Sequence, residues 1–435
     1  MTHRRQSADL TIEVPGLARV EGEGGLRVEV RGGEVVSVAL NIFEPPRFFE
    51  GFLRSRSFEE VPDVTARICG ICPVAYQMSA CAAIEDAFGV TVDGRVAALR
   101  RLLYCGEWVQ SHALHVYLLH APDFLGCADA VELAQLDRAA VQRGLELKRV
   151  GNLLMEAVGG RSVHPVNVRV GGFYRAPRPE DLRALLEPLR RALDASLATA
   201  EWVAGFDYPD VEGEYLFVAL RPDGAYPIDS GPVASSDGLE TTPGGFAELV
   251  VEEHVEHSTA LHARLAGRGA YLTGPLARYA LNSASLPEIA RQASAAAGLG
   301  PVCTNPFRSI AVRAVELVFA CDEAIRLIER YEPPDPPAAE VRPVAGVGHG
   351  ATEAPRGLLL HRYAFDAEGL VREARIVPPT SQNQLSIEDD LRRVVVASIG
   401  AGDGELTARC EQAVRNHDPC ISCAAHFLDV EVERS

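Results

Sequence analysis

Apolar residues in the first sixty positions fall in short runs rich in β-branched side chains, which predicts strands. The runs are 9–14, 26–30 and 35–42. Gly32-Gly33 lies between the last two runs and predicts a tight hairpin turn, because glycine adopts the positive φ angles that such turns require. The chain therefore begins with a strand-rich part.

From about residue 61 onward, apolar residues recur at helical spacing and are interrupted at proline and glycine. The predicted helices are 74–88, 99–121, 130–158, 179–203, 286–297, 307–331, 387–399 and 405–416. A proline-rich run begins at Glu332 and cannot be helical, so 332–350 is predicted to be a connection over the surface. Residues 358–365 and 370–377 are predicted to pair as a hairpin around 366–369.

These patterns predict an α+β, predominantly helical chain, with a central helix bundle, N-terminal strands and a hairpin in the C-terminal half. We expect one domain over 1–426, with a strand-rich part (1–60), a helical part (61–331), the connection (332–350) and a last part with the hairpin (351–426).

Composition excludes several classes of protein. Of 435 residues, 47% are hydrophobic and 23% are charged, as in a globular chain with a sizeable core. The net charge of −18 argues against nucleic-acid binding, and no apolar run approaches the ~18 residues that a membrane span needs. The polar N-terminus shows no signal peptide, and ten cysteines in so long a chain form no disulfide framework. We expect a cytoplasmic protein.

Two Cys-x-x-Cys pairs, Cys69/Cys72 and Cys420/Cys423, are candidates for metal binding. Each pair places two sulfurs on one side of a turn, and thiolates suit zinc, copper(I), iron and nickel. A structural zinc site is one interpretation, although ordinary zinc modules keep both pairs within a few tens of residues. A thioredoxin-like redox pair is another, but it leaves the second pair unexplained. Spacing alone leaves both open beside a catalytic metal centre.

Over nearly its whole length the sequence resembles the large, catalytic subunit of NiFe hydrogenases. Arg-Ile-Cys-Gly-Ile-Cys-Pro from Arg67 resembles the N-terminal metal motif of that family, and 418–426 resembles the C-terminal one. Further similar stretches are 19–22, 47–50, 112–115 with Asp123, 353–357 and 379–383. Residues 305–310 and the Ala-Tyr-Gln after Pro73 are most similar to the cytosolic branch that exchanges electrons with NAD(P).

The resemblance implies a nickel–iron centre. Cys69 and Cys420 would be terminal nickel ligands, while Cys72 and Cys423 would bridge nickel to an iron that carries cyanide and carbon monoxide. The resemblance also implies a second ion, magnesium or iron. Its ligands would be Glu50, the Ile376 carbonyl and His426. This mixture of ligands suits a harder ion than thiolates do. Taken alone, Glu50 is equally typical of a surface carboxylate, and His426 of a histidine at a helix end.

Arg356 and Thr380 flank the predicted hairpin, so antiparallel pairing should bring them close together. In the family these positions, with Pro379 beside them, contact the diatomic ligands of the iron. A guanidinium and a hydroxyl are donors suited to a cyanide nitrogen. The alternative is that Arg356 simply pairs with an acidic neighbour, for example Glu353.

Four further residues near these motifs have weaker assignments. His112 and His115 share one helix face, where packing or hydrogen bonding is favoured over metal ligation. By family analogy, Asp123 pairs with Arg356 or another buried cation. Tyr76 stands where many members of the family have a histidine, and no role is assigned to it.

The resemblance implies the reaction H2 ⇌ 2H+ + 2e−, by heterolytic cleavage at the metals. The Cys420 thiolate would accept the proton and Glu21 would relay it outward, with Arg356 as a competing base. The chain has no further cysteine cluster to carry electrons, which implies an iron–sulfur small subunit, with flavin/NAD(P) subunits beyond it in this branch. A nickel chaperone and a maturation protease are also implied, with removal of residues 427–435.

Two other functions remain open. A hydrogen-sensing regulatory hydrogenase would have the same centre but a signalling partner. A non-catalytic subunit of a respiratory complex resembles hydrogenases but lacks the cysteines, and all four are present here.

Overall fold

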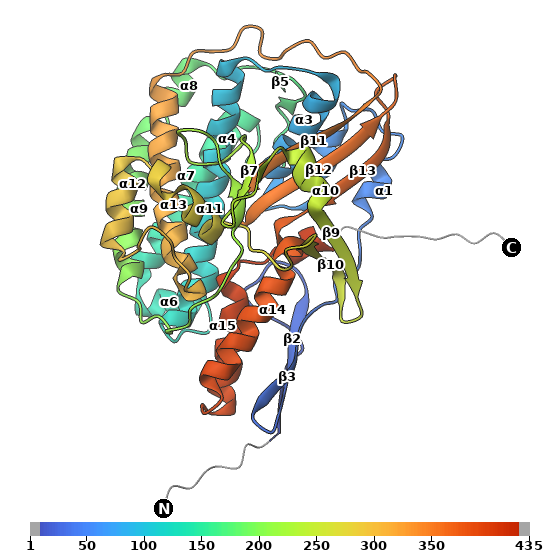
Figure 1. Ribbon diagram of the computed structural model, residues 1–435. Coiled ribbons are helices and arrows are strands. Elements are labelled where there is room, and N and C mark those ends of the chain that lie inside the picture. The colour runs from blue at the N-terminus through green and yellow to red at the C-terminus, as the bar shows by residue number, and fades with distance from the viewer. Residues whose placement is uncertain (1–8, 426–435) are drawn as a thin grey trace, which may run out of the picture.

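The computed structural model describes residues 9–425, and it confirms the predicted α+β, predominantly helical fold (Figure 1). His426 and the predicted extension 427–435 lie outside the described residues. Among the described residues, no helix is both long and apolar enough to cross a membrane.

A bundle of long helices forms the main body. Figure 1 shows α4 (Gly94–Leu114), α7 (Arg138–Gly159), α9 (Leu186–Ala204) and α13 (Ser309–Glu329) side by side, and they pack against one another. The shorter helices of this part are α2 (Val61–Thr65), α5 (Ala121–Phe124), α6 (Ala130–Leu136), α8 (Pro179–Arg183), α11 (Pro275–Asn282) and α12 (Glu288–Ala296). The bundle supplies most of the largest apolar core.

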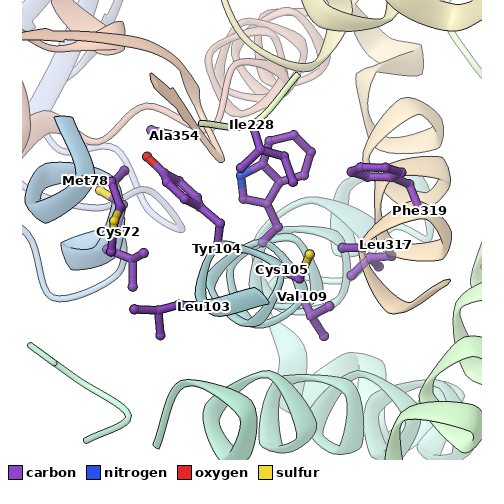
Figure 2. Close-up of a cluster of buried hydrophobic side chains, with 14 of the residues drawn as sticks. Cys72, Met78, Leu103, Tyr104, Cys105, Val109, Ile228, Leu317, Phe319 and Ala354 are labelled. Atoms are coloured by element: carbon purple, nitrogen blue, oxygen red, sulfur yellow. The ribbon is translucent and has the colours of Figure 1, made fainter. Parts of the chain in front are cut away.

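Helix α3 (Pro73–Phe88) lies between this bundle and a three-stranded antiparallel sheet (Figure 1). The sheet contains β11 (Gly346–Ala354), β12 (Gly357–Phe365) and β13 (Val371–Val377) in that order. Strands β12 and β13 are the predicted hairpin. In Figure 2, Cys72 and Met78 of the α3 region lie on one side of α4, and Leu317 and Phe319 of α13 lie on the other. The first cysteine pair is therefore continuous with the core.

A second layer joins the two ends of the chain. Strands β1 (Leu10–Val14), β2 (Gly24–Arg31) and β3 (Glu34–Ile42) form an antiparallel sheet that packs on α14 (Pro379–Ser398) and α15 (Asp403–Asn416). The β2–β3 turn has φ of +59° at Gly32 and +87° at Gly33, which confirms the predicted tight turn. The remaining elements are α1 (Phe49–Leu53), α10 (Pro243–Leu249), α16 (Ile421–Ala424), β4 (Val168–Arg169), β5 (Gly172–Phe173), β6 (Val218–Leu220), β7 (Val233–Ser235), β8 (Glu240–Thr241), β9 (Val250–Val255) and β10 (Ser258–Leu265).

Two predictions about long helices were wrong at their boundaries. The predicted helix 130–158 is two helices, because Asp137 ends α6 and its side chain accepts a hydrogen bond from Ala140 N at the start of α7. The predicted helix 99–121 starts earlier, at Gly94, where the Asp93 side chain caps it, and after Leu114 it continues as the π-helical turn His115–His120.

The predicted connection 332–350 was too long, because its last residues belong to β11. Gly346, Gly348 and Gly350 gave no strand signal, since glycine has low β-propensity. In the structure β11 packs closely on α3, and a Cβ atom at Gly348 or Gly350 would overlap backbone atoms of that helix. The missing side chains thus permit the close approach of strand and helix.

Candidate metal centre

The structure brings the four cysteines of the two pairs into one buried cluster. Cys69 Sγ lies 3.4 Å from Cys420 Sγ, and Cys72 Sγ lies 3.8 Å from Cys423 Sγ. All four sulfur atoms lie within 4.8 Å of one another, and the four residues are 2–3% exposed. No disulfide joins the four cysteines.

Local backbone geometry orients the first pair. Cys69 follows the short 3-10 turn Ala66–Ile68, and Cys72 is the residue immediately before α3. The backbone N–H groups of Ile71 and Cys72 point at Cys69 Sγ, at 3.3 and 3.4 Å. These donors and the positive end of the α3 dipole stabilise negative charge on sulfur.

Glu107 of α4 anchors the start of α3. Its buried carboxylate accepts hydrogen bonds from Val74 N at 2.6 Å and Ala75 N at 3.1 Å. Burial raises the pKa of Glu107 well above its ordinary value, although the two backbone donors oppose this shift. Glu107 was not predicted, although a carboxylate on an otherwise apolar helix face is a signal visible in the sequence.

Two residues of the N-terminal region hold the second pair in place. Glu21 O accepts a hydrogen bond from Ile421 N at 3.0 Å, and the Glu21 carboxylate accepts one from Ser422 N at 3.1 Å. Arg47 donates to Ile68 O at 2.8 Å and also to Ser422 O. One guanidinium thus binds a carbonyl from each cysteine motif. The role of Arg47 was not predicted, because it depends on two segments that meet only in the folded chain.

Arg356 and Thr380 both contact the segment that leads into Cys420. Arg356 Nε donates to Asp418 O at 2.8 Å and Nη2 to Asp418 Oδ1 at 3.1 Å. Thr380 Oγ1 accepts a hydrogen bond from Cys420 N at 2.9 Å, and Pro379 beside it is buried. The alternative that Arg356 pairs with an acidic residue is confirmed, but the partner is Asp418. Glu353, the example named for it, binds Arg278 instead.

The surroundings of the cluster fit a nickel–iron group with small anionic ligands. Four buried thiols provide a soft donor set. Arg356 Nη1 is buried and has no hydrogen-bond partner among residues 9–425, so one donor remains for an acceptor that the chain does not supply. Burial lowers the pKa of Arg356, but Asp418 and the nearby thiols outweigh burial and raise it well above its ordinary value.

The predicted second ion site is only partly within the described residues. Glu50 from α1 and Ile376 from β13 are adjacent, and Ile376 N donates to Glu50 Oε1 at 2.6 Å. The third predicted ligand, His426, lies outside the described residues.

His112 and His115 take no part in the cysteine cluster. His112 Nε2 lies 2.9 Å from Glu316 Oε2, and His115 Nε2 lies 2.8 Å from Arg415 O. Asp123 binds Arg415 at 2.8 Å and not Arg356, so the alternative of another buried cation was the right one.

Tyr76 lies fully buried beside the cluster. Its ring packs against His361, with ring centroids 5.7 Å apart. Burial, together with the nearby thiols of Cys423 and Cys72, raises the pKa of the Tyr76 hydroxyl well above its ordinary value. The hydroxyl therefore stays protonated at neutral pH.

Comparisons with known proteins decide the family. Residues 47–143 match the family model described as nickel-dependent hydrogenase. The chain is 34% identical to the alpha chain of Sulfhydrogenase 1 of Pyrococcus furiosus, over 96% of this chain and 98% of that protein. This chain belongs to the nickel-dependent hydrogenases. It is also 29% identical to a subunit of the F420-non-reducing hydrogenase of Methanothermobacter thermautotrophicus, over 96% of this chain and 94% of that protein.

Solved structures agree with this hydrogenase assignment. A crystal structure of NAD+-reducing [NiFe]-hydrogenase in the H2-reduced state matches with a TM-score of 0.82 and 25% identity, over 96% of this chain and 99% of that one. A NiFeSe hydrogenase from D. vulgaris Hildenborough shares the fold, with a TM-score of 0.77 and 22% identity, over 96% and 100% of the two chains. The chain is the catalytic large subunit of a NiFe hydrogenase. The meeting of both cysteine pairs in one cluster argues against the thioredoxin-like interpretation, which left the second pair unexplained.

Proposed function

We propose that the four cysteines hold a nickel–iron pair and that this subunit cleaves H2 reversibly there into protons and electrons. The electrons pass to NAD(P) in this proposal. The observation that carries the proposal is the buried cluster of four thiols, drawn from motifs 351 residues apart. When bound, the metal pair supplies open coordination positions that polarise H2. Cys69 and Cys420 are the terminal nickel ligands of this proposal, and Cys72 and Cys423 are the bridging ones.

Metal analysis tests the ligand assignment. The matured protein should contain about one nickel per cluster and should show the infrared stretching bands of cyanide and carbon monoxide. Cys69→Ala or Cys423→Ala should abolish both signals, because each removes a ligand, whereas Cys81→Ala should retain them, since Cys81 is buried away from the cluster. Stoichiometric zinc without such bands would refute the proposal.

Arg356 and Thr380 bind the cyanide ligands of the iron in this proposal. Arg356 Nη1 is the buried donor without a partner among the described residues. The Thr380 hydroxyl accepts from Cys420 N, so its own proton is available for a second acceptor. Arg356→Lys should shift the cyanide stretching frequencies while nickel is retained, because one ammonium cannot reproduce both the Asp418 contacts and the free donor.

The proton leaves the centre through Cys420 and Glu21 in this proposal. The Glu21 carboxylate contacts the C-terminal motif, and burial raises its pKa, which the negative charge of Cys69 reinforces. A raised pKa makes the carboxyl group a better proton acceptor than an ordinary glutamate, which suits a proton relay. Arg356 has its pKa raised as well, so it stays charged and is a poor base.

Glu21→Gln tests this route. The amide oxygen can still accept from Ser422 N, so the centre should assemble with normal nickel content while H2/D+ exchange falls by at least about 100-fold. Glu23→Gln, at an exposed carboxylate two residues away, is the control and should exchange normally. Unchanged exchange in Glu21→Gln would remove this residue from the mechanism.

Electrons leave through an iron–sulfur subunit in this proposal. Residues 9–425 contain no second cysteine cluster, and Gly70, beside the buried Cys69, is exposed. Next to this segment, His164 binds Ala66 O at 2.8 Å and Val163 is 44% exposed. Val163 is thus an exposed apolar side chain close to the first cysteine motif, which fits contact with a partner that carries electrons. The Pyrococcus furiosus relative is likewise named as one subunit of a larger protein.

The acceptor is NAD(P) in this proposal, which rests on the similarity to the NAD+-reducing hydrogenase. The purified complex should reduce NAD+ or NADP+ with H2, and the isolated large subunit should not. A complex that reduces a viologen dye but neither nucleotide would favour another acceptor, as the F420-non-reducing relatives suggest. A complex with a kinase partner and negligible turnover would favour the hydrogen sensor.

We also propose that Glu50, the Ile376 carbonyl and His426 bind a magnesium or iron ion.

We further propose that a protease removes residues 427–435 after a chaperone delivers nickel. Ala425, the last described residue, is 0% exposed, so the chain is still inside the core one residue before His426. Because carboxylates such as Asp429 are costly to bury, an extension favours solvent over the core. Mass spectrometry of nickel-loaded protein should find a chain ending at His426; an active chain ending at Ser435 would refute cleavage.

A further inference from the structure

A second cluster of metal-ligating side chains lies on the other layer of the protein. One ring nitrogen each of His257 and His262 and a carboxylate oxygen of Glu388 lie within 4.8 Å of one another. Among the described residues, this is the only such cluster besides the four cysteines. Glu388 follows Thr380 by eight residues on α14, about 12 Å along the helix axis, so the two clusters are separate.

Three elements supply the cluster. His257 lies in the turn between β9 and β10, His262 lies on β10, and Glu388 lies on α14, which packs against this hairpin (Figure 1). Glu388 Oε1 also accepts a hydrogen bond from Leu40 N of β3, at 2.9 Å. The cluster therefore joins both terminal regions of the chain to the β9–β10 hairpin.

One of these ligands has an unused nitrogen. His262 is 3% exposed, and its Nε2 atom is buried without a hydrogen-bond partner among residues 9–425. Buried polar atoms in folded proteins usually have a partner, so this nitrogen is available to a ligand that the chain itself does not provide. The rings of His257 and His262 are 5.4 Å apart and nearly perpendicular, at 86°.

The donor set selects the class of ion. Two imidazoles and one carboxylate suit zinc and similar divalent transition ions, whereas magnesium and calcium prefer oxygen ligands only. Tetrahedral zinc with bonds of about 2.0 Å holds its donors roughly 3.3 Å apart. His257 Nε2 lies 2.9 Å from Glu388 Oε1, so small side-chain rotations would give this spacing. The His257 side chain is 33% exposed, which leaves a route for the ion from solvent.

We propose that His257, His262 and Glu388 bind one divalent transition ion of the zinc class, which fastens the β9–β10 hairpin to α14. The site is structural and takes no part in H2 cleavage. Its consequence is that metal analyses of this protein should find one ion per chain beyond those of the cysteine cluster and the proposed Glu50 site.

Zinc binding to the purified complex tests the proposal. After treatment with a chelator, equilibrium dialysis against radioactive zinc should find one high-affinity site that His257→Ala and Glu388→Gln each weaken by roughly 100-fold or more. The control His349→Ala removes a histidine outside both clusters and should bind zinc as the wild type does. His257 is partly exposed, so its variant removes a ligand without opening the core, and unchanged nickel content verifies that each variant is folded.

Zinc-edge X-ray absorption gives an independent result. The zinc of the wild-type complex should show two imidazoles and oxygen in its first shell, with no sulfur. Equal zinc binding by wild type and both variants, a sulfur shell, or no binding at micromolar zinc would each overturn the proposal, and the cluster would then be an ordinary histidine–carboxylate hydrogen bond.

Discussion

The fully buried guanidinium of Arg278 uses all five of its N–H groups. Nε and Nη2 donate to the two oxygens of Glu316, each at 2.8 Å, and Nη1 donates to Glu353 Oε2 at 3.1 Å. The two remaining N–H groups donate to Ala354 O at 2.8 Å and Pro355 O at 2.9 Å. These carbonyls immediately precede Arg356, so Arg278 fixes the backbone from which Arg356 reaches Asp418 beside the cysteine cluster.

We predict that Arg278→Met lowers the free energy of unfolding by about 5 kcal/mol. Methionine approximates the volume but leaves the Glu316 carboxylate buried without its cation, and breaking a buried pair costs about 3–5 kcal/mol. Loss of the two carbonyl contacts adds about 1 kcal/mol each, partly relieved by repacking. With about 2.1 cal/mol/K of unfolding entropy per residue, a cooperative unit of 435 residues loses roughly 1 °C per kcal/mol, so Tm should fall by about 5 °C.

Calorimetry of the complex tests this prediction by measuring Tm, and two further variants serve as comparisons. Arg278→Met/Glu316→Gln removes both charges of that pair and should recover at least half of the loss, because the uncompensated Glu316 anion is the main cost. Glu353, the second partner of Arg278, remains, but burial raises its pKa to about 7, so it can take up a proton. Arg149→Met breaks an ion pair with Glu146 whose side chains are 52% and 44% exposed, and it should change Tm by less than about 1 °C. The reasoning would be refuted if Arg278→Met lowered Tm by less than 1 °C, or if the double variant had a Tm no higher than that of Arg278→Met.

The other predictions concern stability and assembly. Burial lowers the pKa of His112 to about 4 and of His120 to about 3. As pH falls below 6.5, the unfolded chain protonates these histidines before the folded protein does. The free energy of unfolding, measured by calorimetry, should therefore fall by up to about 2.7 kcal/mol for each pH unit between pH 6.5 and 4. Glutamine variants of the two histidines should show a flatter dependence on pH. Val163→Glu should weaken binding of the iron–sulfur partner in pull-down assays at least about tenfold, unlike Val131→Glu at a 68% exposed residue. Glu107→Gln should cost about 1–3 kcal/mol by chemical denaturation, because an amide cannot accept both N–H groups at the start of α3.

The helices and the central hairpin could be predicted because their apolar spacing is regular over many residues. Prediction from apolar spacing fails where a single residue changes the structure within a regular pattern. Asp137 divides two helices whose apolar faces continue across it, so periodicity alone could not find the break. The glycines of β11 carry no strand signal, because their function is to let the strand approach α3 closely.

The cysteine cluster could be predicted because chelation imposes a spacing that is visible in the sequence. Its supporting residues impose none. Arg47 binds both motifs, Glu107 anchors a helix, and Asp418 orients Arg356, yet each resembles an ordinary surface charge when taken alone. Their roles depend on segments that are far apart in the chain and meet only after folding. His262 was missed for the same reason.

The hydrogen bonds of the two cysteine motifs indicate an order of assembly. The first motif is fixed by its own helix, by α4 and by Arg47, all of which lie within 47–114 of the chain. The second motif is fixed from four distant places, by Glu21, Arg47, Arg356 and Thr380, and it can be seated only after these have folded together. Because the seated cluster is only 2–3% exposed, entry of a metal from solvent would require this motif to open. We therefore infer that metal loading precedes docking of the second motif, and that its four sets of hydrogen bonds form last and close the site.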